Sequence, residues 1–364
     1  MPDVIVVGGG VIGLSIAWEL AGHGVSVKVL ERGAFGREAS WAGAGMLPPG
    51  NLSRARTSEA RFRGAAHQLW PEWSDRLTSQ TSGKNDFCQC GGLEVRFADD
   101  PDGEPDFQTG LDTLRDEGVL IESEDVELIR ERCPALSAEI TRAYSMPDFR
   151  QVRNPRHLQT LQLGCTLRGV ELVSSSPVRR IEFHGDRIES VQGDSETHRA
   201  SEYIFAGGAW SKDLLAQAGI GLEIEPVKGQ MVLLRAELMP FRCVIQLGHR
   251  YLVPRNDGLI LIGSTEERTG FDKRNTASAI GDLIQFGRRI VPCLSDATFE
   301  TCWAGLRPYS ATGRPQIGRL PQFSNAFVAA GHYRYGLHLS PITAVLIRQL
   351  LLNQTIMLPE DVLN

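Results

Sequence analysis

The sequence predicts a mixed α/β fold that joins a βαβ unit to an antiparallel sheet. The first observation is a strand, glycine turn, helix and strand pattern within residues 1–31, and the second is a series of strand-like runs joined by turn residues between residues 227 and 265. A strand, glycine turn and helix return near the end of the chain, from Ala326 to Leu351. At 364 residues, 42% of them hydrophobic, the chain can bury a core spread over about two or three domains.

The N-terminal elements follow from short-range patterns. Val4 to Val7 is an apolar run of valine and isoleucine, typical of a strand covered on both faces. Apolar residues then recur at helical spacing from Val11 to Ala21, and Gly22 begins the turn that ends this helix. Val25 to Leu30 is expected to form the second parallel strand.

Further elements are predicted along the rest of the chain. Pro101 to Asp106 is expected to form an exposed loop close to a boundary or excursion between ordered pieces. A helix is expected from Pro155 to about Arg168, and Val178–Ile181 and Arg187–Gln192 are expected to form a small meander. The remaining predicted elements are strands at Tyr203–Ala206, Gln230–Leu234, Tyr251–Val253, Leu259–Ile262 and Ala326–Ala330, and an amphipathic helix at Ile342–Leu351.

Composition argues against several classes of protein. The 38 basic and 44 acidic residues give a net charge of −6 and are scattered along the chain, so no basic patch for nucleic acid is expected. Seven irregularly spaced cysteines include one close pair, Cys88 and Cys90, which predicts reduced thiols in a cytoplasmic protein and no metal site. The N-terminus lacks the basic region of a signal peptide, and no apolar run of about 20 residues predicts a membrane span.

The turn after the first strand carries the pattern Gly8-x-Gly10-x-x-Gly13. In a Rossmann-like unit such glycines allow a tight turn, close approach of the backbone to a pyrophosphate, and close packing of the helix on the strand. Glu31 follows the second strand, where a carboxylate accepts hydrogen bonds from ribose hydroxyls and disfavours the 2′-phosphate of NADP. The motif leaves NAD and FAD open. Gly36 to Met46 is rich in small residues, which suits either contact with a flat ligand or a flexible loop.

Six blocks together resemble the D-amino-acid oxidase superfamily of FAD-dependent oxidoreductases, and within it the glycine oxidases of the thiamine pathway (ThiO type). The blocks are GGGVIG, Glu31-Arg32, REASWAGAGML, AGGAWS at 206–211, CWAGLRPYSATGRPQIG at 302–318 and AAGHYRYGLHLSP at 329–341. Their order and spacing cover nearly the whole chain. The resemblance implies extended FAD with its flavin ring between two domains, an FAD-binding domain of residues 1–82, 150–222 and 304–364 and a substrate-binding domain of residues 83–149 and 223–303.

The resemblance also implies which residues contact FAD. Those at the pyrophosphate and adenosine are Gly8, Gly10, Val11, Ile12, Gly13, Glu31, Arg32 and Val178. Those along the phosphates and flavin are Ala39, Ser40, Ala44, Gly45, Met46 and Gly207, with the block His332, Tyr333, Arg334, Tyr335, Gly336, Leu337 and His338, whose backbone amides would face the pyrimidine end of the ring. Cys302 lies in the region of the cysteine that anchors flavin in some relatives, but a core-strand thiol and a non-covalent flavin are favoured.

Four residues are implied at the substrate. Arg307, within Gly-Leu-Arg-Pro, matches an arginine whose planar guanidinium forms a fork with the substrate carboxylate. Tyr251 matches a tyrosine whose hydroxyl helps to hold that carboxylate, His249 lines the pocket, and Arg334 faces the substrate side of the flavin. Tyr335 departs from the asparagine that family members often carry, so the pocket shape at the ring edge is left open.

The implied activity is oxidative deamination of glycine or a similar small amino acid to the 2-oxo acid, ammonia and hydrogen peroxide, with oxygen as acceptor and a role in thiazole synthesis for thiamine. Such catalysis rests on orientation of the substrate α-hydrogen against the flavin and on charge stabilisation, without an obligatory side-chain base. A D-amino-acid or sarcosine-type oxidase or dehydrogenase is the nearest alternative, and a non-catalytic flavin-binding subunit is a third. The sequence leaves open the amine substrate, the electron acceptor and whether the chain forms a homo-oligomer.

Overall fold

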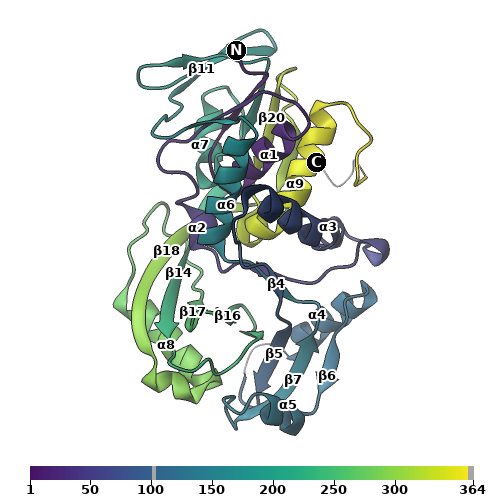
Figure 1. Ribbon diagram of the computed structural model, residues 1–364, viewed down its shortest axis with the longest axis vertical. Helices are drawn as coiled ribbons and strands as arrows, with labels where there is room; N and C mark the ends of the chain where they lie inside the picture. The colour runs from purple at the N-terminus through teal and green to yellow at the C-terminus, as the bar shows by residue number, and fades with distance from the viewer. Residues whose placement is uncertain (101–103, 360–364) are drawn as a thin grey trace.

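The computed structural model describes residues 1–100 and 104–359, which form two halves around two large sheets (Figure 1). A six-stranded sheet lies in the half that contains the N-terminus, and an eight-stranded sheet lies in the other half. Where the chain passes between the halves, three short strands form a small sheet of β3 (Met46–Leu47), β8 (Arg150–Gln151) and β4 (Cys88–Gln89).

The six-stranded sheet contains the predicted βαβ unit. Its strand order is β19 (Gln316–Arg319), β20 (Ala326–Ala330), β13 (Glu202–Phe205), β1 (Val4–Val7), β2 (Val27–Leu30) and β9 (Glu171–Val173). All neighbours are parallel except β19 and β20. β1 lies centrally because its β-branched side chains are buried on both faces. The carboxyl ends of the parallel strands share one edge, where ligands bind in open α/β sheets.

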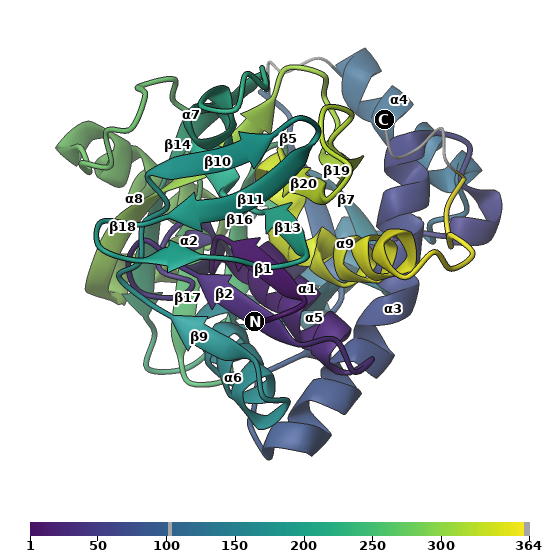
Figure 2. The ribbon, with the colours of Figure 1, turned by 90° about the horizontal axis from the view of Figure 1, so that it is seen from above.

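Helices cover one face of this sheet and a small sheet covers the other (Figure 2). The helical layer consists of α1 (Val11–Ala21), α3 (Ser58–Thr81), α6 (Asn154–Leu167) and α9 (Gly336–Leu351). The opposite layer consists of β10 (Arg180–His184), β11 (Arg187–Gln192) and β12 (Thr197–His198), with α7 (Ser211–Ala216) beside them. Each layer buries the apolar side chains that point from alternate positions of β1.

The eight-stranded sheet forms a wall of the second half. Its order is β18 (Thr298–Ser310), β14 (Ile224–Arg235), β17 (Leu259–Gly263), β16 (Arg250–Pro254), β15 (Val244–Leu247), β5 (Gly92–Phe97), β7 (Ile140–Met146) and β6 (Glu122–Glu124). Neighbours are antiparallel except β15 and β5, which are parallel. The other helices of the described chain include α2 (Ala39–Ala42), α4 (Glu104–Asp116), α5 (Val126–Arg132) and α8 (Ala277–Ile290).

Most predicted elements are confirmed. β1, α1, β11 and β20 have the predicted bounds. β2, α6, β13, β14, β16 and β17 overlap their predicted ranges and differ at their ends. The antiparallel pairing expected between residues 227 and 265 is present, and so is the β10–β11 meander.

The prediction of a loop at 101–106 is wrong for residues 104–106, the part of it that the structure describes. Residues 101–103 lie outside the described chain, and Glu104 to Asp106 begin helix α4. Pro105 does not prevent a helix because proline is tolerated in the first helical turn. Leu111, further along α4, is buried against the eight-stranded sheet, and this packing stabilises the helix.

Two other boundaries need correction. β10 begins at Arg180, so Val178 lies outside the strand. α9 begins at Gly336 instead of Ile342, and its residues are buried on every side from His338 to Ile347, so this part is not amphipathic. Among the described residues, no helix is long and apolar enough to cross a membrane.

Candidate functional site at the junction of the two halves

A cavity of about 1880 Å³ extends from the carboxyl edge of the six-stranded sheet to the eight-stranded sheet. At the sheet edge it is lined by the predicted residues Gly8, Gly10, Val11, Ile12, Glu31, Arg32, Ala39, Ser40, Ala44, Gly45, Met46, Val178 and Gly207. Towards the other sheet it is lined by His249, Tyr251, Arg307, His332, Tyr333, Arg334, Tyr335, Gly336 and Leu337. The predicted cofactor and substrate residues thus meet in one cavity, with two exceptions, Gly13 and His338.

The glycine turn owes its shape to two close backbone approaches. Gly8 has a φ of +115°, and a Cβ atom on it would lie 2.4 Å from the carbonyl oxygen of Ala206. A Cβ atom on Gly13 would lie 1.9 Å from the carbonyl oxygen of Gly8. Gly13 does not line the cavity, but it lets α1 approach β1 closely enough to place the helix N-terminus at the cavity wall.

Glu31 braces the turn from the end of β2. Its carboxylate accepts hydrogen bonds from the backbone N–H of Gly9 at 2.7 Å and of Gly33 at 3.0 Å. The guanidinium of the neighbouring Arg32 lies over the ring of Trp210, 3.4 Å from its centroid, and forms an ion pair with Glu38. A carboxylate, an aromatic face and a cation therefore surround the end of the cavity to which the resemblance assigns the adenosine.

The small-residue segment is an ordered structure, so its interpretation as a flexible loop is wrong. Ser40, in α2, accepts a hydrogen bond from the N–H of Val11 at 2.9 Å, and Asn154 donates to the carbonyl of Ser40 at 2.7 Å. Arg255 donates to the carbonyl of Ala44 at 2.6 Å. Gly45 has a φ of +75°, which a side chain would strain. These bonds hold the segment against the cavity.

The residues present fit an FAD molecule. The N-cap of α1 is Gly10, which provides no side-chain cap, so the helix N-terminus is available to an anionic pyrophosphate. The cavity exceeds the roughly 300–1,000 Å³ of ordinary small-molecule pockets. An extended dinucleotide together with a small substrate accounts for a cavity of this length and lining.

The side chains of Arg307 and Tyr251 both contact Ser264, which directly follows β17. Arg307, on β18, donates to Ser264 Oγ at 2.6 Å and to the carbonyl of Thr265 at 3.1 Å. The Tyr251 hydroxyl, on β16, lies 3.4 Å from the same Ser264 Oγ. A Cβ atom on Gly229 would lie 2.1 Å from Arg307 Nη2, so this glycine leaves room for the guanidinium.

Arg334 and His249 lie beside this centre. Arg334 belongs to the 3-10 turn Tyr333–Tyr335 that follows β20, and its guanidinium lies 3.3 Å from His249 Nδ1. Arg334 also forms an ion pair with Glu266, whose other carboxylate oxygen accepts a hydrogen bond from the Tyr333 hydroxyl at 2.5 Å. Burial alone would raise the pKa of Glu266, but the Tyr333 hydroxyl and the charges of Arg334 and other nearby groups hold it below its usual value. Glu266 is therefore ionised near neutral pH.

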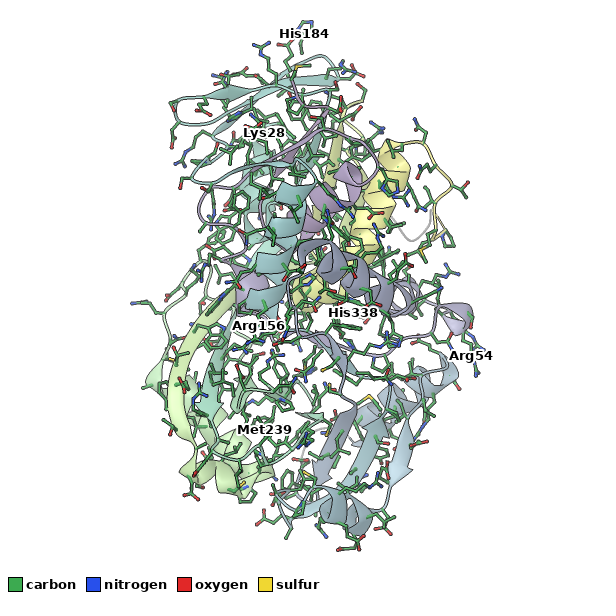
Figure 3. The ribbon with its side chains drawn as sticks, in the orientation of Figure 1. Lys28, Arg54, Arg156, His184, Met239 and His338 are labelled. Carbon is green, nitrogen blue, oxygen red and sulfur yellow. The ribbon has the colours of Figure 1, made fainter. Side chains whose placement is uncertain are left out.

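The block from His332 to His338 runs from the cavity into the core. Burial lowers the pKa of His332 to about 3, and its Nε2 lies 3.0 Å from Thr343 Oγ1. His338 is buried in α9, near the middle of the molecule (Figure 3). Its backbone carbonyl accepts a hydrogen bond from Trp70. Tyr335, the departure from the family pattern, lines the cavity and is 40% exposed. A tyrosine side chain thus contributes to the wall there.

Some expectations concern residues that stand apart from the cavity. Cys302 does not line it and packs instead against the apolar cluster between β14 and α8, as expected for a core-strand thiol. Within the described chain, no cluster of three or more histidine, cysteine, aspartate or glutamate side chains could hold a metal ion.

Three residues of the site, Ser264, Glu266 and Gly229, were not predicted from the sequence, because their neighbours in sequence carry no motif. Trp210 was given no role either, although it lies within the AGGAWS block.

Comparisons with known proteins agree with this arrangement. The chain is 38% identical over 355 residues to a glycine oxidase from Pseudomonas aeruginosa, covering 96% of this chain and 94% of the relative. It is 33% identical to the bifunctional protein ThiO/ThiG from Synechocystis sp., covering 97% of this chain and 52% of that protein. The crystal structure of glycine oxidase from Geobacillus kaustophilus superposes with a TM-score of 0.93 at 28% identity, covering 100% of this chain and 98% of that one.

The match to a family extends over nearly the entire sequence. Residues 3–350 match the family designated DAO and described as FAD dependent oxidoreductase. The fold, the glycine turn and the cavity at the sheet edge all agree with this match. The chain belongs to the DAO family of FAD-dependent oxidoreductases, and FAD is its cofactor.

Proposed function

We propose that the protein catalyses the FAD-dependent oxidative deamination of glycine or a similar small amino acid, with oxygen as acceptor. The products are the 2-oxo acid, ammonia and hydrogen peroxide. The substrate class is supported by relatives named glycine oxidase at 38% and 35% identity. It is also supported by the cation and hydroxyl groups that face the cavity opposite the nucleotide end.

Arg307 carries the proposal. Within the described chain it forms no ion pair, and its guanidinium is held by the neutral Ser264 hydroxyl and the Thr265 carbonyl. A cation fixed by neutral groups keeps its charge for a ligand, and the planar guanidinium suits the two oxygens of a carboxylate. The α-carboxylate of an amino acid is the matching group.

The remaining residues orient the substrate. The Tyr251 hydroxyl and the Arg307 guanidinium both contact Ser264 Oγ. The hydroxyl would therefore donate a hydrogen bond to the carboxylate that Arg307 binds. His332 stays neutral at the cavity wall because burial lowers its pKa. FAD, when bound, supplies the redox chemistry by accepting a hydride from the substrate α-carbon and passing electrons to oxygen. The protein contributes orientation and a fixed positive charge.

The proposed roles at the other end follow the same geometry. Gly10, Val11 and Ile12 would hold the pyrophosphate at the α1 N-terminus, and Glu31 the ribose. The proposed FAD-binding domain, residues 1–82, 150–222 and 304–364, contains every strand of the six-stranded sheet. The proposed substrate-binding domain, residues 83–149 and 223–303, contains seven strands of the other sheet, while β18 crosses the boundary.

Two further proposals concern the setting of the reaction. A role in thiazole synthesis for thiamine is supported by the 33% identity to the protein named ThiO/ThiG. A cytoplasmic location is supported by the seven cysteines, all of which are free in the structure.

The direct test is anaerobic reduction of the bound flavin. The purified protein is mixed without oxygen with glycine, sarcosine, D-alanine and D-proline, and the loss of the oxidised flavin absorbance is followed. We expect glycine to bleach the flavin and, once oxygen is admitted, glyoxylate, ammonia and peroxide to form. Bleaching by the bulkier D-amino acids but not by glycine would instead support the D-amino-acid oxidase alternative, and no bleaching by any of the four would refute an amino-acid oxidase.

A further inference from the structure

A second, smaller chamber adjoins the substrate end of the main cavity. It has a volume of about 310 Å³ and is lined by His249, Arg250, Ser264, Thr265, Glu266 and Arg334. His249, Arg250, Ser264 and Arg334 also line the main cavity, so the two spaces meet at these side chains. Glu266 is the acidic residue of this lining, and it forms an ion pair with the predicted substrate residue Arg334. Arg334 in turn contacts His249, the other predicted substrate residue here.

The two arginines at this junction differ in their charge balance. Arg307 is held by neutral groups, whereas Arg334 already has a carboxylate partner in Glu266. Arg250 lines both spaces as well, and its guanidinium lies 5.6 Å from the centroid of Phe286, which also lines the main cavity, so Arg250 faces a different part of the wall from Ser264. Glu266 pairs directly with Arg334 and also feels the charge of Arg307, but Arg307 itself forms no ion pair within the described chain, so its guanidinium beside Ser264 is the one without a direct carboxylate partner.

Both carboxylate oxygens of Glu266 have a hydrogen-bonding partner. One oxygen accepts from the Tyr333 hydroxyl and the other pairs with Arg334. Its side chain is 45% exposed and that of Arg334 is 29% exposed, so a ligand in the main cavity can compete for the guanidinium. A second negative charge arriving there would have to displace Glu266 and would be repelled by it.

We infer that Glu266 determines the specificity of the site for substrates with a single carboxylate. By occupying Arg334 it leaves Arg307 as the guanidinium beside Ser264 that can receive the substrate carboxylate, and its own charge opposes any further carboxylate on the substrate side chain or amine. This inference rests on the proposed function and deepens it, because it restricts the substrate class to monocarboxylate amino acids. Glu266 acts as a specificity-determining residue through Arg334.

The test compares the binding of acetate and malonate to the flavin-loaded protein, followed as the change in flavin absorbance. In the parent protein we expect malonate to bind no more tightly than acetate. In Glu266→Gln, which frees Arg334, we expect malonate affinity to rise about tenfold or more while acetate affinity changes less than about threefold. Adding Arg334→Gln to this variant should abolish the gain, and Glu266→Asp, which retains the charge, should keep the preference of the parent.

The matched control is Glu225→Gln, which removes a carboxylate paired with the exposed Arg268 outside both spaces. An equal malonate gain in this control, or no gain in Glu266→Gln, would overturn the inference. If Glu266→Gln does not load flavin, the parent alone decides, since malonate binding tenfold tighter than acetate would contradict an occupied Arg334. These titrations need no turnover, so a failure of glycine to reduce the flavin would refute the proposed function while leaving this measurement intact.

Discussion

The two ends of the cavity are assembled from the chain in different ways. At the nucleotide end, most of the wall comes from the segment between Gly8 and Met46, and its hydrogen bonds use backbone N–H groups of the turn, such as those of Gly9 and Val11. At the substrate end, Arg307, Tyr251 and Ser264 come from separate elements, and the first two contact Ser264 through side chains. Arg334, from another element, contacts His249 and Glu266. The first end depends on local backbone shape, and the second depends on the register of the eight-stranded sheet. Substitutions should therefore separate flavin binding from flavin reduction.

The largest effect is expected from Gly13→Val at the nucleotide end. Its Cβ atom would lie 1.9 Å from a backbone oxygen, so α1 must move away from β1 and the flavin site should collapse. We expect protein without bound flavin, measured as the ratio of flavin to protein absorbance. The control is Gly281→Ala on the exposed face of α8, where a Cβ atom meets nothing within 4 Å and helix propensity should stabilise the fold by about 1 kcal/mol. Full flavin content in Gly13→Val would contradict the proposed role of the turn.

Arg307→Ala should impair reduction of the flavin by the substrate without affecting flavin binding. Truncating one partner of a hydrogen-bonded charge pair costs about 2–5 kcal/mol, so the kcat/KM for glycine should fall about thirtyfold or more while flavin stays bound. Stopped-flow reduction and the flavin-to-protein ratio measure the two properties separately. Arg274→Ala, which removes an exposed arginine paired with Asp272, should leave both unchanged. Loss of flavin in Arg307→Ala would mean that the two ends are not separable.

The stability of the block that joins the two ends should depend on pH. His332 and His338 each have a pKa lowered by burial to about 3. Below their unfolded value of about 6.5 the unfolded chain binds protons that the folded chain does not, so stability is lost as the pH falls from about 6.5 towards 3. Each histidine contributes up to about 1.4 kcal/mol per pH unit in this range. We expect His332→Gln to reduce the pH slope of urea-unfolding free energy between pH 6.5 and 4.5, and an unchanged slope would contradict the buried neutral state.

The smallest effect is expected from Ser264→Ala. The hydroxyl bridges Arg307 and Tyr251, and its loss removes hydrogen bonds worth about 1 kcal/mol without removing either group. We expect the KM for glycine to rise roughly fivefold with flavin content unchanged. Steady-state kinetics check this value against Ser295→Ala, an exposed serine that bonds Arg288. A loss as large as that of Arg307→Ala would show that the serine does more than position its neighbours.

The same contrast explains how far the sequence predicted the site. The turn at Gly8 and the carboxylate of Glu31 lie within one local βαβ unit, so their spacing alone indicated a dinucleotide. The resemblance to the family then predicted Arg307, Tyr251 and Arg334 as substrate residues. Ser264 and Glu266 reach the site only because β17 pairs with both β14 and β16, which brings Gly263 opposite Met231 and Tyr251. This pairing of distant strands cannot be predicted from a short-range sequence pattern.

The errors in the predicted elements have a related cause. The segment that begins at Glu104 is polar and contains Pro105, yet it forms the first turn of α4 because residues further along the helix are buried against the sheet. α9 begins before Ile342, and the helix packs against α1 and α3, with Trp70 of α3 bonded to the carbonyl of His338. Tertiary burial, which the local pattern does not encode, decides both boundaries.

The central claim is that one cavity places the flavin beside a carboxylate held by Arg307. Titration of the flavin-loaded protein with glycolate, which has the carboxylate of glycine but no amine, tests this claim directly. We expect a saturable change in the flavin absorbance spectrum in the parent protein and its loss in Arg307→Ala at equal flavin content. No spectral change in the parent, or the same titration curve in both proteins, would contradict the claim.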